Sequence, residues 1–469
     1  MSFRISKFMG TLSSWGHAAT LLGVGVWAVA AEADPGAAVR HVRVTLSVDG
    51  ELHGPASGSA DPARQSIAME AAFDFQETVR SADPEAAATR RYREATAELD
   101  VGDEKQSLVL PEDARVVTVA RLGTTPQPHL PGAYLSRDEL ELLETPFDSL
   151  LLEELLPGRP VMEGDRWPLA GDLAAGLLAI DTVETGTLEA RVVEVADGVA
   201  RVALAGGVDG AVDGVPTHVN VDGSFTVAVE PDEDGHMPVG DVTRLEATVR
   251  ERRQAGHVAA GFEIEARLAV VRETIAASDA DSGAEPTGGE RPAGLRRHGP
   301  GGPGMVWYRD GEGRYDLVHE SGWRCVEEDA GGLVLRLIDF GALVAQCSIT
   351  ALPRSPEAAV PALDEVKRHV EQSLSGQFRR FDGATETVRP EDGVRVVRVV
   401  SEGVAEGLPF RWVHYVLTDD SGHRVNVAFM VEASLERRFA DADGRFVAGL
   451  RLAPDARRDA ALPRKTATP

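Results

Sequence analysis

The chain has 469 residues, of which 43% are hydrophobic, so it is long enough to fold into two or three domains with packed cores. Its formal net charge is −27, and a surface with that charge repels phosphate backbones and anionic lipid headgroups. The composition therefore excludes an intrinsically disordered chain, and the charge argues against nucleic acid as a partner.

The first 33 residues have the order of charged and apolar residues found in export signals. Arg4 and Lys7 precede a stretch without Lys, Arg, Asp or Glu, whose most apolar part, Leu21–Ala30, is followed by small residues. We therefore expect residues 1–33 to be a signal peptide and the mature protein to be periplasmic or extracellular. The alternative is an uncleaved signal that anchors the chain by its N-terminus. If the signal is cleaved, we expect no stable membrane insertion.

Residues 34–275 are predicted to form a β-rich domain, because most of this segment alternates between apolar and polar residues. The alternating runs, each typical of an antiparallel strand, are Val39–Leu52, Ile67–Val79, Tyr92–Val101, Gln106–Leu110, Arg115–Leu122, Thr187–Val195, Ala200–Ala205, Thr217–Glu230, Val242–Arg253 and Phe262–Arg272. Asp-Gly pairs indicate hairpin turns at Asp197-Gly198, Asp222-Gly223 and Asp234-Gly235.

Three short helices are predicted in the middle of this domain. Ser136 and Glu139 form a capping-box pattern that opens a helix ending at Leu143. A second helix is expected to begin at Asp148 and to end at Pro157-Gly158. The third is expected over Asp172–Ile180.

The last predicted strand indicates how the sheet is buried. Phe262, Ile264 and Leu268 fall on one side of this strand, and Glu263 and Glu265 fall on the other. One face is therefore buried and one is wet, and long strands of this kind curl around their helices into a half-barrel. This shape resembles the LolA-like exported carriers in architecture only, without a matching residue motif, and the resemblance implies an apolar ligand in the concave face.

A change in composition separates this domain from a second one. Residues 276–304 are rich in glycine and proline and contain almost no apolar side chain larger than alanine, so they are expected to form a flexible linker. The second domain is predicted over residues 305–455, and residues 456–469 are expected to be a disordered tail. The two domains need not be docked rigidly.

The second domain is predicted to combine an antiparallel sheet with helices. The expected elements are a meander over Trp323–Thr350, a helix over Leu363–Phe378, a strand over Val394–Val400, a hairpin over Arg411–Val431 and a last helix over about Leu435–Val447. The turn of the hairpin contains Gly422, which supplies the positive φ that such turns need.

The hairpin has two apolar faces, and each is expected to be covered by a helix. We expect Val370 and Leu374 of the first helix to pack on the face that bears Tyr415 and Phe429. The C-terminal helix should then cover the opposite face, which bears His414.

The two cysteines, Cys325 and Cys347, both fall in this second domain. In an exported protein they could form a disulfide. In a simple meander, however, the strand between them would hold them about two strand spacings apart, ~9 to 10 Å, which is too far to bridge. We favour two buried thiols and keep the disulfide as the alternative.

Several stretches of the second domain resemble the PsbP-like fold, an α/β/α sandwich. They are LVLRLIDFGALVAQCSITALP, the helix ALDEVKRHVEQSL, VRVVRVVSEG and the hairpin. The whole chain also resembles a group of exported bacterial two-domain proteins without an established activity. The PsbP-like resemblance implies a non-catalytic accessory or binding module, and no functional residue is carried over because none matches.

No stretch of the chain has the pattern of a catalytic, cofactor or metal site, so no site residue and no cofactor is predicted. Asp232–His236 and Asp441–Gly444 resemble fragments of a calcium loop, but neither has the further carboxylates that such a loop requires. We interpret the first fragment as a solvated hairpin turn. Trp167 is expected to be a core aromatic side chain.

Two further groups have a functional and a structural interpretation. Arg250 and Arg252 share one face of a strand and could hold a carboxylate or phosphate, but Glu246 and Glu251 favour a solvated, ion-paired sheet face. His414 could act as a base or ligand. No serine, cysteine or carboxylate accompanies it at a recognisable spacing, so we expect its ring to be hydrogen-bonded by backbone or water.

The absence of a chemical signature, together with the signal and the linker, leads to one functional hypothesis and two alternatives. We expect an exported, non-enzymatic binding or accessory protein that acts on another envelope component. The first alternative is a carrier of an apolar small molecule in the concave face of the N-terminal domain, and the second is an enzyme whose site has no recognisable motif.

Overall fold

The computed structural model of the protein describes residues 39–53, 64–79, 88–122, 125–229, 239–276, 299, 301–354 and 361–452. The predicted signal peptide (1–33), the tail (456–469), most of the linker (276–304) and the Asp232–His236 segment lie outside the described residues. Clustering of contacts divides the chain into two compact units, which separate between Gly304 and Met305. Both units consist mostly of antiparallel strands with a few short helices, which confirms the predicted α+β class.

The first unit is built on one antiparallel sheet, which has 12 strands in the described part of the chain. In chain order these strands are β1 (Val39–His53), β2 (Arg64–Val79), β3 (Ala88–Val101), β4 (Glu104–Val109), β5 (Val116–Leu122), β6 (Thr125–His129), β8 (Arg166–Pro168), β9 (Thr182–Ala196), β10 (Val199–Val212), β11 (Val215–Val229), β12 (Val239–Arg253) and β13 (Gly261–Ile275). Across the sheet the order is β6-β5-β3-β2-β1-β13-β12-β11-β10-β9-β8, and β4 pairs with β3.

The pairing of β1 with β13 joins two meanders into this single sheet. It runs without a register shift from Val39 opposite Ile275 to His53 opposite Gly261. Alternate residues of the two strands, among them Val44, are buried on one face, as the alternation of apolar residues predicts. The first and the last strand of the unit are therefore neighbours in the middle of the sheet.

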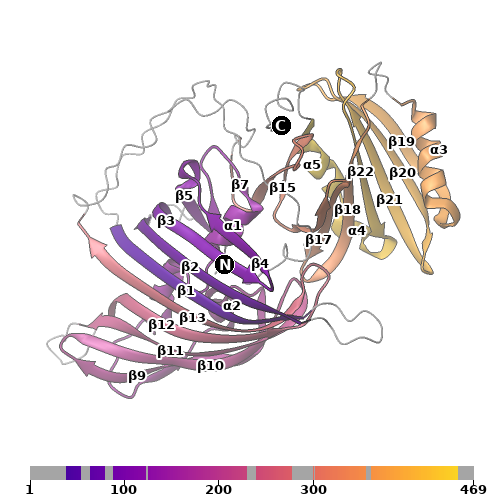
Figure 1. The fold of residues 1–469 in the computed structure, drawn as a ribbon. Coiled ribbons are helices and arrows are strands. Elements are labelled where there is room, and N and C mark those ends of the chain that lie inside the picture. The colour runs from indigo at the N-terminus through magenta and orange to yellow at the C-terminus, as the bar shows by residue number, and fades with distance from the viewer. Residues whose placement is uncertain are drawn as a thin grey trace, which may run out of the picture. The chain divides into compact units, whose positions relative to one another are not determined.

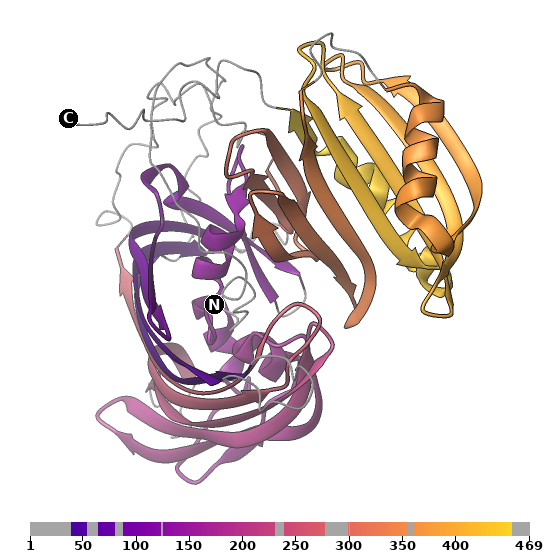
Figure 2. The same cartoon turned by 45° about the vertical axis from the view of Figure 1, so that its right-hand side comes forward.

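Short helices fill the space inside the curve of the sheet, which curls around them (Figures 1 and 2). The helices of this unit are η1 (Glu112–Ala114), α1 (Arg137–Leu143), η2 (Ser149–Leu155) and α2 (Gly171–Leu178), and the short strand β7 (Leu135–Ser136) precedes α1. Their leucines, such as Leu142, Leu151 and Leu177, are buried. This arrangement is the predicted half-barrel with helices on its inner side.

The predicted helix starts are confirmed. Ser136 Oγ accepts a hydrogen bond from the N–H of Glu139 at 3.2 Å, and Glu139 Oε2 accepts one from the N–H of Ser136 at 2.8 Å, which completes the capping box. Asp148 caps η2 by accepting a hydrogen bond from a backbone N–H of that helix at 2.9 Å. The helix η2 is a 3₁₀-helix and ends at Leu155, two residues before the predicted end.

The predicted turn at Asp222-Gly223 is wrong, because β11 continues through both residues. A Cβ atom at Gly223 would lie 2.5 Å from the carbonyl oxygen of Glu246, so glycine serves here for close approach of two strands. The turn that does interrupt the sheet is Asp213-Gly214, where both φ angles are positive. The turn predicted at Asp197-Gly198 is present, and Asp234-Gly235 lies outside the described residues.

The second unit contains an antiparallel sheet with seven strands in the described ranges, in the order β16-β17-β18-β22-β21-β20-β19. These strands are β16 (Trp323–Asp329), β17 (Gly332–Asp339), β18 (Ala342–Leu352), β19 (Phe378–Val388), β20 (Arg395–Ala405), β21 (Leu408–Thr418) and β22 (Arg424–Glu432). Three shorter strands, β14 (Met305–Arg309), β15 (Tyr315–Glu320) and β23 (Leu450–Leu452), pair in the order β14-β15-β23.

Helices lie on both faces of the seven-stranded sheet, so the predicted α/β/α layering is confirmed (Figure 2). One face is covered by α3 (Leu363–Leu374), and the other by η4 (Ala433–Leu435), α4 (Glu436–Phe439) and α5 (Ala442–Ala448). In the part of the chain that the structure describes, no helix has both the length and the apolar character needed to cross a membrane.

The helix α3 is shorter than predicted. It ends at Leu374, and Ser375 has a φ of 48°, which starts the short 3₁₀-helix η3 (Ser375–Gln377). The chain then continues from Phe378 as β19, a strand that was not predicted. Because β19 is an edge strand and its residues are largely exposed, it lacks the alternation that reveals a half-buried strand.

The helices cover the opposite faces from those predicted. Val370 of α3 packs against Val399 and Val416, on the face of the sheet that also bears His414. The face that bears Tyr415 and Phe429 is instead covered by α4 and α5. The physical reason is the kind of side chain that each helix buries: α4 and α5 add aromatic rings to the Phe429 face, whereas α3 buries valines, against Val397, Val399 and Val416.

The covered aromatic face forms a cluster of rings around Phe429. The ring centroids of Trp323, Tyr415, Phe439 and Phe446 lie 5.7, 6.1, 5.8 and 5.5 Å from that of Phe429, and the Phe446 ring is perpendicular to it. Such edge-to-face pairs add about 0.5–1.5 kcal/mol to the effect of area burial. The α4–α5 segment therefore supplies the aromatic partners that this face requires.

Cys325 and Cys347 are both free thiols, as predicted, but the prediction that both are buried is wrong for Cys325, which is only half-buried. Both lie opposite Leu335 of the middle strand β17, one on each side of it. Cys347 is buried, and its burial raises the pKa of its thiol well above the ordinary value. The intervening strand keeps the two sulfur atoms apart, as the meander predicts.

The placement of the helices leads to a stability prediction. We expect Phe429→Ala to lower the free energy of unfolding by about 3–5 kcal/mol, because it removes a fully buried ring. In double-mutant cycles, Phe429→Ala should couple to Phe446→Ala by about 0.5–1.5 kcal/mol and to Val370→Ala by less than about 0.5 kcal/mol. Urea unfolding of the full chain, followed through the transition of the second unit, measures both. Equal couplings would contradict this packing.

Candidate functional site

A row of polar side chains crosses the inner face of the first unit near one end of its strands. Arg90 of β3 lies opposite Glu77 of β2, Glu77 lies opposite Arg40 of β1, and Arg40 lies opposite Thr274 of β13. We call these four residues the polar row. They lie on the same inner face as apolar residues such as Phe75. The alternation of apolar and polar residues along the strands predicts apolar side chains at these positions.

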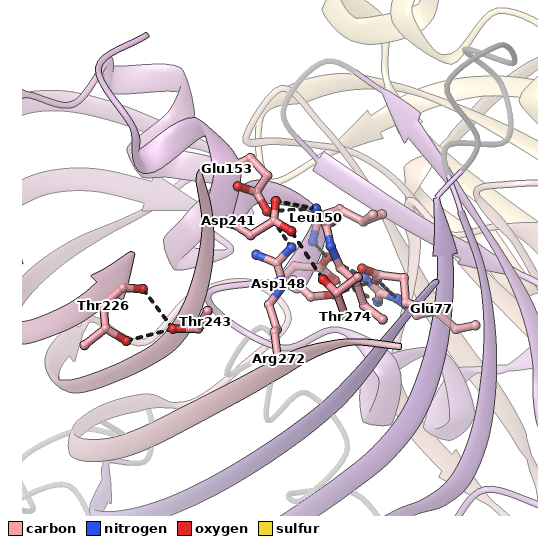
Figure 3. Close-up of polar contacts among 12 residues, drawn as sticks. Glu77, Asp148, Leu150, Glu153, Thr226, Asp241, Thr243, Arg272 and Thr274 are labelled. Atoms are coloured by element: carbon pink, nitrogen blue, oxygen red, sulfur yellow. Dashed lines mark hydrogen bonds and ion pairs between the residues drawn. The ribbon is translucent and has the colours of Figure 1, made fainter. Parts of the chain in front are cut away.

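The helix η2 contacts one end of the polar row through its first residues. The Arg90 guanidinium binds both carboxylate oxygens of Asp148, at 2.9 and 2.5 Å, and its Nε donates to Glu77 Oε1 at 2.9 Å. Ser149 Oγ donates to the same oxygen of Glu77 at 2.6 Å. Asp148 is thus both the cap of η2 and the partner of Arg90, which fixes the start of the helix on the sheet (Figure 3).

These charges are buried, so their contacts with one another are strong. The side chains of Arg90 and Glu77 are 3% and 0% exposed. Burial by itself lowers the pKa of Arg90, but Asp148 and Glu77 outweigh it and hold the pKa well above its ordinary value. The pKa of the neighbouring Tyr92 is raised to about 12, chiefly by burial. Arg90 therefore stays charged.

A second group of charges lies at the other end of the polar row. Glu153 of η2 accepts from Arg272 Nη2 at 2.6 Å and from Arg40 Nη2 at 3.0 Å, and Arg40 also donates to Asp241 at 3.2 Å. Figure 3 shows Glu153 and Asp241 beside Arg272, with Thr274 donating to Asp241 at 3.4 Å. The helix is therefore held to β1 and β13 as well as to β2 and β3.

The charge balance of this region does not suit an additional anion. Three guanidinium groups face four carboxylates, those of Glu77, Asp148, Glu153 and Asp241. Although Nε and Nη1 of Arg272 have no protein partner among the described residues, the surplus is negative. No group of three or more His, Cys, Asp or Glu residues is placed to hold a metal ion in the described ranges. The arrangement is one that docks a helix.

Sequence reasoning missed this cluster, although its signal was present. In β2, Phe73 and Phe75 are followed at the same spacing by Glu77, and in β13 Leu268 and Val270 are followed by Arg272. A charged residue that continues an apolar alternation at the end of a strand indicates a buried polar contact. The partners, however, come from a helix far along the chain.

The groups that the sequence did single out are used structurally. Arg250 and Arg252 bind Glu265 and Glu263, which lie opposite them on β13, at 2.8 and 2.9 Å. The solvated face is therefore as predicted, but the partners are not Glu246 and Glu251. Glu251 is buried and binds Arg253 and Thr217 instead.

The second calcium-like fragment also has a structural role. Asp443 lies in α5, where its carboxylate accepts from Tyr415 Oη at 2.7 Å and from Arg398 at 2.9 Å. This contact holds α5 against the sheet and satisfies the hydroxyl of a buried tyrosine. Trp167 is buried as predicted, and its Nε1 donates to the carbonyl of Leu155 at 2.8 Å.

His414 lies on β21 and faces the layer of α3. Its Nε2 is buried without a hydrogen-bond partner among the described residues, so the expected backbone partner for this atom is not found. Burial, with a smaller contribution from His369, lowers the pKa of His414 to about 4. The ring is therefore neutral at physiological pH, where it packs as a weakly polar group between Trp412 and Val416 on the same face.

Comparison with known proteins yields structural likenesses only, since no family model and no curated protein sequence matches the chain. The chain is similar to the solution structure of PsbP from the cyanobacterium Synechocystis sp. PCC 6803, at 15% identity over 36% of this chain and 99% of that one, with a TM-score of 0.27. It is also similar to the Pseudomonas aeruginosa protein of unknown function PA94, at 16% identity over 32% and 98%, with a TM-score of 0.24.

A further likeness, to lipovitellin, has 11% identity and a TM-score of 0.28, and covers 54% of this chain and 27% of that one. All these TM-scores are below 0.5, so the likenesses decide neither the fold nor the function of the chain. A PsbP structure is thus among its structural neighbours, and no more than that.

The contact of Arg90 leads to a second stability prediction. Arg90→Ala should lower the free energy of unfolding of the first unit by about 3–5 kcal/mol, because it leaves Asp148 and Glu77 buried without their partner. Arg252→Ala, which removes an exposed ion pair with Glu263, is the matched control and should cost less than about 1 kcal/mol. Urea unfolding of the full chain measures both. Equal losses would show that the buried contact is not needed to hold η2.

His414 leads to a prediction about pH. Its pKa is lower in the folded state, about 4, than in the unfolded state, so the unfolded chain binds a proton first as the pH falls. The contribution of the neutral ring is complete above pH ~6.5 and is lost as the pH falls toward 4, by up to about 3 kcal/mol.

We therefore expect His414→Leu to reduce the loss of thermal stability of the second unit between pH ~6.5 and 4. His257→Gln, at an exposed histidine of the first unit, is the control and should leave that loss unchanged. Calorimetry of the full chain at a series of pH values provides the comparison. A loss of the same size in the His414→Leu protein would contradict the assignment to this ring.

Proposed function

We propose that the protein is an exported, non-enzymatic binding or accessory protein that acts on another envelope component. In this proposal the first unit is a rigid scaffold and the second unit is a PsbP-like binding module. The observation that carries it is the filled inner face of the half-barrel, where the side chains of Leu151, Leu152 and Leu155 are fully buried against the sheet.

The filled inner face favours a scaffold over a carrier of an apolar molecule. A carrier needs an apolar cavity of several hundred Å³ lined by its strands. The inward-facing residues Val42, Leu46 and Phe73 are no more than 3% exposed. Their side chains therefore have almost no surface left for a ligand, and η2 is fixed beside them on the inner face by its contacts with Arg90 and Arg272.

The contacts of the buried charges favour a structural role over catalysis. Catalytic groups are aimed at a place that a substrate can reach. Here Arg90, Asp148 and Ser149 are directed at one another or at Glu77, and the same is true of Arg398 and Asp443 in the second unit. Their hydrogen bonds fix helices on sheets.

Native mass spectrometry of the protein recovered from the exported fraction of its cells tests the proposal. We expect the mass of the chain without residues 1–33 and no stoichiometric adduct, because the signal is removed and the inner face holds no ligand. The denatured spectrum of the same sample is the control, since it gives the mass of the chain alone. Recovery of the chain with an intact Met1 in the cytoplasmic fraction would contradict the export proposal. A bound apolar adduct of a few hundred daltons would favour the carrier.

A further inference from the structure

The hairpin between β17 and β18 ends in a fully exposed aromatic residue. Phe340 is 99% exposed, and it is the only aromatic side chain among the large hydrophobic residues that are exposed in the described ranges. Burial in the core cannot explain its presence. A single exposed apolar side chain is common on protein surfaces, so a contact at Phe340 is inferred from its turn and its neighbours.

The turn holds Phe340 in a conformation that other residues adopt more readily. Phe340 and Gly341 are the two central residues of a tight turn, and their φ angles are 40° and 72°. Two-residue turns with positive φ at both positions favour Asn or Asp followed by Gly. The same kind of turn in the first unit carries Asp213 before its glycine. Phenylalanine at this position therefore has a backbone cost without a contact in the fold that offsets it.

The tip of this hairpin is held in place by a side chain of α4, about 100 residues further along the chain. Arg438 of α4 donates to the Asp339 carboxylate at 2.9 Å, and it also donates to the backbone carbonyl of Asp339. The residue before Phe340 is thus fixed to a helix that packs on the aromatic core. The ring is presented on an anchored support.

A second hairpin places apolar side chains at the same end of the sheet. The register of β18 with β22, of β22 with β21 and of β21 with β20 sets the tip of the β20–β21 hairpin at the end where Phe340 lies. Leu408 and Val404 flank this second tip and are 48% and 36% exposed. The centres of the two hairpins are about three strand spacings apart, ~14 Å, and the hairpins end in the same direction.

Two separate apolar tips that end in the same direction fit a flat apolar layer better than a single pocket. Phenylalanine and leucine are typical of the apolar side of segments that bind at the membrane interface, and the ion pair of Asp339 with Arg438 suits the headgroup region. The net charge of −27, with Glu406 at the second tip, opposes attraction to anionic lipids. The matching surface is therefore zwitterionic lipid.

We propose that the Phe340 and Leu408 tips bring the second unit into reversible contact with a zwitterionic lipid surface. The proposal rests on the proposed function as an exported protein and names lipid as an envelope component that it binds. The contact is weak, because even a complete myristoyl chain gives only marginal membrane binding. It tethers the unit to a surface without spanning the bilayer.

Tryptophan placed at each tip tests this contact locally, whatever the N-terminal segment does. We expect F340W and L408W to gain fluorescence quenching, relative to the unsubstituted protein, with vesicles of brominated phosphatidylcholine. V388W is the matched control, because Val388 is 56% exposed and lies at the opposite end of the same sheet. Equal quenching at all three positions, or none at either tip, would overturn the proposal. So would quenching that requires an anionic lipid.

A second variant separates the loss of lipid contact from the loss of the fold. F340N should leave the thermal midpoint unchanged or raise it, because asparagine suits the positive φ of this turn. In a double variant with L408W, the fluorescence quenching at position 408 reports the affinity for vesicles. We expect F340N to lower this affinity about tenfold, because it removes one large apolar side chain from the contact. Unchanged affinity would show that the tips do not act together. The absence of lipid contact would not change the mass expected for the exported protein in native mass spectrometry, so the two proposals can fail separately.

Discussion

The contact between the Arg90 guanidinium and the Asp148 carboxylate determines how the helices of the first unit sit on its sheet. Taking these charges out of water has a high cost, which their bidentate geometry and the hydrogen bonds to Glu77 and Ser149 offset. Because Asp148 also caps η2, the same carboxylate starts the helix and sets its position. The buried leucines of η2 follow from that position.

The second unit is organised by the difference between the two faces of its sheet. One face presents valines, and the valine stripe of α3 covers it; the other presents Phe429 and Tyr415. A buried tyrosine hydroxyl requires a partner, and Asp443 of α5 provides it. Side-chain volume and a single polar group thus decide which helix covers which face. The hairpin tips lie beyond both layers and remain available for contact.

Local periodicity was sufficient to predict most of this fold. The strands from Val39 to Phe262, the capping box at Ser136 and the separation of the cysteines depend on neighbours in sequence, so their signals are readable in a single chain. Asp222-Gly223 shows the limit, because the same dipeptide serves in a turn or where strands approach closely, and only the partner strand distinguishes the two.

The candidate site could not be predicted in the same way. Glu77 was visible as a charge in an apolar alternation, but its partners lie 13 and 72 residues away, on β3 and η2. The choice of face by α3 was likewise hidden, since either face of the hairpin is apolar enough to receive a helix. Pairing between distant segments depends on the complete set of competing contacts, which periodicity does not contain.

The pairing of β1 with β13 also determines how the first unit responds to force. Val39 and Ile275 lie opposite each other, so the outer ends of these two strands lie at the same end of the sheet. Tension applied between Val39 and Ile275 would act across this pair and break its hydrogen bonds one after another, from the outer end inwards. Under such tension the first unit would open in the middle of its sheet.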